Sequence, residues 1–133
     1  MSKPQETYTQ TPYERLGGEV VLRQLVERFY QLMNELPEAR GIRKMHAADL
    51  GGASAKLFKF LSGWLGGPNL FVEEYGHPRL RARHFPFPIG TAERDQWMLC
   101  MDRALDETLM DAELRKLMRQ ALAQTATHMI NQA

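Results

Sequence analysis

Apolar side chains recur every three or four positions in several stretches of this chain, which is the repeat of a helix with one buried face. The first stretch covers residues 19–36 and the second covers 51–65. A third is expected at 92–107 with Thr91 as its cap, and a fourth begins after Asp111. No stretch alternates apolar and polar positions for long enough to predict a β-strand. The pattern therefore predicts an all-α protein.

The ends of these helices are marked by residues that interrupt a helix. Gly17-Gly18 precedes the first helix, Pro37 follows it, and Gly66-Gly67-Pro68 ends the second. A short helical piece is expected at about 38–46. The last helix has the clearest apolar face, formed by Leu114, Leu117, Met118, Ala121, Leu122, Thr125 and Met129.

The segment from Gly66 to Gly90 differs from the rest because it carries prolines and aromatic residues without a helical repeat. Only a turn or two of helix, at 77–83, is expected in it. A loop of this length inside a compact domain is usually functional or ordered by a ligand. This segment is therefore the first place to look for a site.

Length and composition indicate one domain, with residues 1–12 as a flexible tail and 13–133 as the folded unit. The net charge of +1 gives no reason to expect a nucleic-acid partner. No stretch is apolar enough to predict a membrane span. The single Cys100 excludes an internal disulfide and, with the polar first residues, favours a cytoplasmic location.

The residue types around His84 indicate a ligand that is flat, apolar and anionic at one edge. Arginines precede this histidine at 79, 81 and 83, where they could neutralise two carboxylates, and Phe85 and Phe87 follow as an apolar wall. Haem has these properties. From the residues alone, a surface histidine in a basic loop is the simpler interpretation.

The other three histidines have simpler interpretations. His77, between glycine and proline, suits a turn, and His128 is expected to be structural. His46, next to Met45, could face inward. A zinc site built from His77 and His84 is rejected because one cysteine and no nearby acidic pair leave too few ligands.

Tyr30 and Trp97 lie on the apolar faces of two expected helices, where each could be an ordinary core residue. A buried hydroxyl or indole N–H needs a hydrogen-bond partner, however. The two residues are therefore also candidates for donors to a bound ligand.

The chain resembles the group II truncated haemoglobins, the two-over-two helical globins, over nearly its whole length. The most specific match is the block that ends at His84, followed thirteen residues later by Trp97. The other matching motifs are Tyr13-Glu14-Arg15-Leu16-Gly17-Gly18, Arg28-Phe29-Tyr30, Phe60-Leu61, Trp64-Leu65-Gly66-Gly67-Pro68, Gly76-His77-Pro78, Pro86-Phe87, Cys100-Met101, His128-Met129 and Asn131-Gln132.

The resemblance implies haem b (iron protoporphyrin IX) in a two-over-two sandwich with a short, loop-like proximal segment. It makes His84 the iron ligand and Tyr30 and Trp97 distal donors. Ala53 stands where classical globins have a distal histidine. His46 stands where relatives more often have tyrosine or phenylalanine, so the resemblance places an ionisable ring at the border of the distal ligand pocket. The remaining implied haem contacts are Lys56, Arg81 and Arg83 at the propionates, and Leu57, Phe71, Phe87 and Met98 at the apolar part.

Three functions follow as hypotheses. The first is reversible binding of dioxygen and other diatomic ligands, with release slow enough to favour scavenging or redox chemistry over bulk delivery. The second is a catalytic haem protein, either peroxidase-like or a nitric oxide detoxifier that needs a reductase partner. The third, from another class, is a cofactor-free helical interaction module, which would leave the 66–90 segment without an evident reason to be ordered.

Overall fold

The computed structural model describes residues 10–132, and within that range every regular element is a helix. The prediction of an all-α chain is confirmed. Among the described residues, no helix is long and apolar enough to cross a membrane. The elements in chain order are α2 (Pro12–Leu16), α3 (Gly18–Glu35), the 3₁₀ turn η1 (Pro37–Ala39), α4 (Arg40–Arg43), α5 (Gly51–Trp64), α6 (Leu70–Tyr75), α7 (Leu80–His84), α8 (Thr91–Thr108) and α9 (Ala112–His128).

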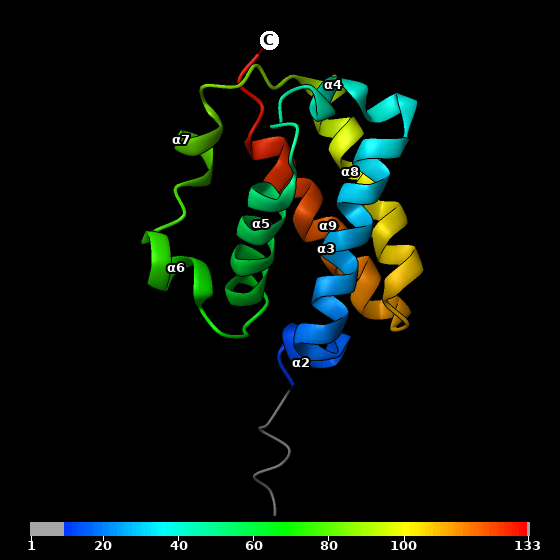
Figure 1. The fold of residues 1–133 in the computed structure, drawn as a ribbon. Coiled ribbons are helices and arrows are strands. Elements are labelled where there is room, and N and C mark those ends of the chain that lie inside the picture. Colours follow the sequence, from blue (N-terminus) through cyan, green and yellow to red (C-terminus); the bar gives the residue numbers. More distant parts are fainter. Residues whose placement is uncertain (1–9, 133) are drawn as a thin grey trace, which may run out of the picture.

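Four long helices build the core, with α3 packed against both α5 and α8, and α8 packed against α9 (Figure 1). The helical repeat read from the sequence places the right side chains inside. Removal of these side chains from water drives the packing. The completely buried ones include Leu22, Leu25, Phe29, Leu61, Met101, Ala104 and Leu105.

Two details of the helices differ from the sequence prediction. Thr91 is the first residue of α8 rather than its cap, because the N–H of Gly90 donates to Glu93 Oε1 at 2.7 Å and Gly90 takes the cap position. Leu117 is 47% exposed although it falls in the apolar repeat of α9. Asp111 does cap α9, accepting from the N–H of Leu114 at 3.0 Å.

Helix α2 was not expected, and it includes Pro12 from the segment assigned to the tail. Thr11 caps it: its hydroxyl accepts from Glu14 N, and Glu14 accepts in return from Thr11 N. Gly17 then turns the chain into α3 with φ +118°, a value that L side chains rarely adopt. Residues 1–9 of the predicted tail lie outside the described residues.

The segment predicted to be mostly loop contains two short helices, α6 and α7, where only one was expected. Both lie beside α5 on the side away from α3 and α8 (Figure 1). Helix α6 buries only Phe71, and α7 buries no side chain at all. This part of the chain has no core of its own, so the positions of α6 and α7 depend on contacts with other groups.

Cys100 provides a test of the core that does not depend on any ligand. Its side chain is completely buried in α8, and burial raises the pKa of the thiol to about 11. Because the thiolate is the reactive form, we expect a thiol reagent such as DTNB to leave the folded protein unmodified at neutral pH and to react after unfolding. Rapid labelling of the folded protein would contradict this packing.

Candidate functional site

His84 is the last residue of α7, and its ring is oriented by its own helix. Nδ1 lies 2.6 Å from the carbonyl oxygen of Leu80, one turn earlier. A carbonyl only accepts hydrogen bonds, so Nδ1 carries the proton and donates. The lone pair of a neutral ring is then on Nε2. Histidines that bind a metal commonly have this arrangement, in which one ring nitrogen binds the metal and the other donates to a nearby acceptor.

Aromatic and cationic side chains gather where α5, α6 and α7 meet. The Phe71 ring lies 4.8 Å from that of Tyr75, measured between centroids. The guanidinium of Arg83 lies 5.4 Å from the centroid of Phe71, and the ammonium of Lys56 lies 5.6 Å from that of Tyr75. Arg83 donates to the carbonyl oxygen of Pro78 at 2.6 Å, but neither cation forms an ion pair within residues 10–132. The charges of both are therefore left without an anionic partner.

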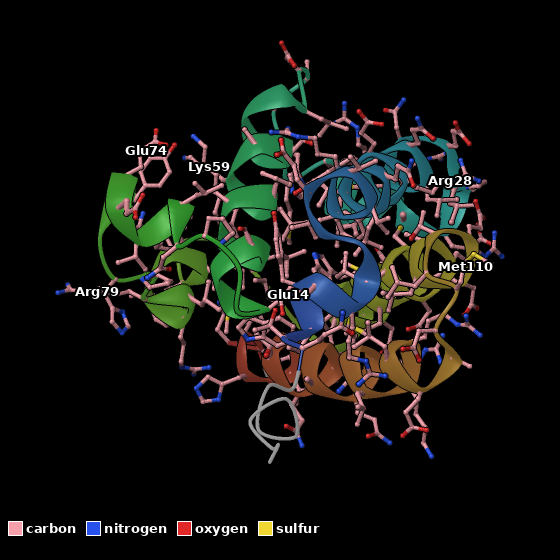
Figure 2. The ribbon with its side chains drawn as sticks, turned by 90° about the horizontal axis from the view of Figure 1, so that it is seen from below. Glu14, Arg28, Lys59, Glu74, Arg79 and Met110 are labelled. Atoms are coloured by element: carbon pink, nitrogen blue, oxygen red, sulfur yellow. The ribbon has the colours of Figure 1, made fainter. Side chains whose placement is uncertain are left out.

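The neighbouring lysine on α5 is used differently. Lys59 forms an ion pair with Glu74, and Figure 2 shows the two side chains close together between α5 and α6. The contact attaches α6 to the longer helix. Arg79, also labelled there, points outward from the start of α7.

Arg81 is directed away from Lys56 and Arg83. Its guanidinium donates to the carbonyl oxygens of His128, at 2.5 Å, and of Ile130, at 3.1 Å. Of the three cations expected near the propionates, the structure brings two to the Phe71–Tyr75 group. It places the third against the end of α9.

The three residues expected on the distal side form one aromatic group with Phe29, which contacts Tyr30 and Trp97, while His46 contacts Tyr30. The Phe29 ring centroid lies 4.8 Å from that of Tyr30 and 5.0 Å from that of Trp97. His46, in the turn after α4, lies 5.9 Å from Tyr30 between ring centroids, and its Nδ1 is 2.8 Å from the carbonyl oxygen of Ile42. His46 is half-buried and turned toward Tyr30.

The polar atoms of this distal group are poorly satisfied by the protein. The Tyr30 side chain is buried, and its hydroxyl donates only to the carbonyl oxygen of Ala53 at a long 3.4 Å. Burial raises the pKa of this hydroxyl, which keeps it protonated as a donor. The indole N–H of half-buried Trp97 has no acceptor within the described range. Both donors can therefore serve a ligand.

The apolar residues expected around a cofactor divide into two sets. Ala53, Leu57 and Met98 pack partly buried against the core. Phe87, in the connector from α7 to α8, is 42% exposed, and the adjacent Phe85 is 69% exposed. These two rings are an apolar surface that the described residues leave uncovered.

A cleft of about 640 Å³ opens between α5, α7 and α9, a size typical of sites for small molecules and cofactors. Its apolar lining comes mainly from Phe60, Trp64, Leu80 and Met129. Leu80 lines the cleft, and its carbonyl oxygen also accepts from the His84 ring. The group of Phe29, Tyr30, His46 and Trp97 does not line this cleft. Phe60 and Leu80 were not among the haem contacts expected from the sequence, although each lies one helical turn from a residue that was.

Comparison with known proteins decides the family. The model for bacterial-like globins matches residues 11–131. A group 2 truncated haemoglobin of Bacillus subtilis is 42% identical over 121 residues, covering 91% of this chain and 89% of the relative. This chain belongs to the group II truncated haemoglobins.

Solved structures of this family confirm the two-over-two helical globin fold. The group II 2-on-2 haemoglobin of Agrobacterium tumefaciens superimposes with a TM-score of 0.93 at 50% identity, covering 100% of both chains. The oxygen-avid truncated haemoglobin of Bacillus subtilis gives a TM-score of 0.84 at 41% identity and covers 92% of this chain and 100% of its own. Membership of a haemoglobin family implies a haem cofactor and diatomic ligands.

The residues of this globin fit a haem. The His84 imidazole has its Nε2 available for the iron. Lys56 and Arg83 have no carboxylate partners and suit the propionates, and the uncovered apolar rings suit the porphyrin. Two poorly satisfied distal donors correspond to a ligand site. Tyr75, which contacts Phe71 and lies under Lys56, belongs to the same group of side chains and was not predicted from the sequence.

Proposed function

We propose that this globin binds haem b through His84 Nε2 and uses it to hold dioxygen and similar diatomic molecules reversibly. When bound, the haem supplies an iron with one open coordination position. The observation that carries the proposal is the His84 ring, whose Nδ1 donates to the Leu80 carbonyl and leaves Nε2 as the free ligand atom. Lys56 and Arg83 would hold the propionates, while Leu57, Phe71, Phe87 and Met98 would contact the porphyrin.

Tyr30 and Trp97 would set how long the ligand stays. When bound, the haem would make its diatomic ligand partly negative, so these two residues would stabilise the ligand as hydrogen-bond donors aimed at it. A hydrogen bond to a charged group contributes about 1.5–3 kcal/mol. The weak contact of the Tyr30 hydroxyl with Ala53 means that little is lost when the hydroxyl turns to a ligand. Slow release is consistent with an oxygen-avid relative and favours scavenging or redox chemistry over delivery.

The direct test is to reconstitute the full chain with haem, reduce it and measure oxygen binding and release by stopped-flow absorbance. We expect a five-coordinate ferrous spectrum and reversible oxygen binding. Turnover of hydrogen peroxide or of nitric oxide with a reductase, well above that of free haemin, would instead assign a catalytic function. A protein that stays colourless with excess haemin would overturn the proposal.

We further propose a cytoplasmic location. The only cysteine of the chain is Cys100, and its side chain is completely buried in α8. A single thiol without a disulfide partner is usual for proteins of a reducing compartment.

A further inference from the structure

The connector that follows His84, residues 85–90, has little of its own to hold it in place. Helix α7 buries no side chain, and two connector residues, Pro86 and Pro88, have no backbone N–H to donate. Carbonyl groups of such a segment need donors from elsewhere. The position of His84 therefore depends on the part of the chain to which the connector is attached.

That attachment is the side-chain amide of Asn131, in the segment that follows α9. Its Nδ2 donates to the carbonyl oxygen of Phe87 at 2.9 Å and, more weakly, to that of His84 at 3.4 Å. Its Oδ1 accepts from the backbone N–H of Ile89 at 3.0 Å. The backbone N–H of Asn131 also donates to the Ile89 carbonyl at 2.8 Å. Asn131 thus bonds to four backbone groups, which belong to residues on both sides of the two prolines.

The pattern requires an amide. The nitrogen faces carbonyl oxygens and the oxygen faces an N–H, so a carboxylate of the same shape would place an oxygen against the Phe87 carbonyl. Figure 1 shows the segment after α9 reaching the connector at one end of the molecule. The amide therefore joins residues that are far apart in the sequence but adjacent in the fold.

The same segment also holds α7 directly. Arg81 donates to the carbonyl oxygens of His128 and Ile130, so residues 128–132 contact α7 as well as the connector. His84 lies between these two attachments. Any displacement of the segment would change the orientation of the ring that His84 presents.

We propose that Asn131 is a positioning residue for His84, fixing the angle and distance at which Nε2 meets the haem iron. This inference rests on the proposed role of His84. Loss of the amide would leave the His84 and Phe87 carbonyl groups without this donor, and only the backbone bonds from Asn131 and Gln132 to the Ile89 carbonyl would still hold the connector. Helix α7 could then shift, so the bond between His84 and the iron would be longer and less uniform.

The test compares Asn131→Ala and Asn131→Asp with the wild type as full-length, haem-loaded proteins. The main readout is the iron–histidine stretching band of the ferrous form in resonance Raman spectra. The second is the rate of haem transfer to excess apomyoglobin. Gln120→Glu is the matched control, because it makes the same amide-to-carboxylate change at an exposed position of α9.

We expect the stretching band to move or broaden in both Asn131 variants, and haem loss to be about tenfold faster, which corresponds to about 1.4 kcal/mol. Gln120→Glu should match the wild type in both measurements. A band unchanged in both Asn131 variants, even with a lower melting temperature, would overturn the proposal and reduce Asn131 to a structural residue. Absence of the band from the wild type would instead refute His84 as the ligand.

Discussion

Replacement of His84 by glycine is expected to abolish the five-coordinate haem spectrum of the ferrous protein. The side chain is the proposed axial ligand, and its loss leaves only the apolar and propionate contacts to hold the cofactor. We expect haem loss to be about 100-fold faster or more, which corresponds to at least about 2.8 kcal/mol. Because α7 buries no side chain, the substitution should leave the core of α3, α5, α8 and α9 folded.

Free imidazole provides the complementary measurement. Added to His84→Gly, it should occupy the space of the missing ring and restore a spectrum close to that of the wild type. His77→Gly is the matched control, since it removes an exposed ring from the same segment, one that accepts from the N–H of Arg79. Wild-type spectra and haem retention in His84→Gly would place the iron ligand elsewhere.

Replacement of Tyr30 by phenylalanine should raise the rate of oxygen release by about 10- to 150-fold, from the loss of a hydrogen bond of about 1.5–3 kcal/mol to the charged ligand. The fold should tolerate the change, because the hydroxyl contributes only the long bond to the Ala53 carbonyl. Stopped-flow measurement of oxygen release from the ferrous protein gives the rate directly.

Tyr13→Phe is the control for this experiment, as it removes a hydroxyl from α2, where the tyrosine ring packs under Gly67. Its oxygen release should equal that of the wild type. An unchanged rate in Tyr30→Phe would remove Tyr30 from the distal network and leave Trp97 as the principal donor. Trp97→Phe, measured in parallel, shows how the two donors share the effect.

The long helices could be predicted from the sequence because their apolar repeat extends over several turns. Helix α6 has only one buried residue, Phe71, so its sequence shows no apolar repeat from which a helix could be predicted. Helix α2 is equally short, but Thr11-Pro12 with Glu14 is a capping-box pattern with proline at the first helical position, and it could have been recognised. Short helices depend on their caps and on tertiary contacts rather than on periodicity.

Which of the candidate site residues lie together was also predictable only in part. Tyr30, His46 and Trp97 were named from the sequence, and the structure brings them into one aromatic group that includes Phe29. The direction of a long cationic side chain could not be predicted from the sequence, because Arg81 could have faced either α6 or α9. The carbonyl groups left free at the end of α9 attract it. Such choices depend on groups that are distant in the sequence.

The absence of buried side chains in α7 has a consequence for how the cofactor is exchanged. Local opening of a segment costs little free energy when no core packing is broken. We therefore expect the α7 segment to open locally while the four long helices stay assembled, so that the cofactor would be loaded and lost without global unfolding. Hydrogen exchange of the cofactor-free protein should then show α7 amides exchanging far ahead of those in α3 and α8.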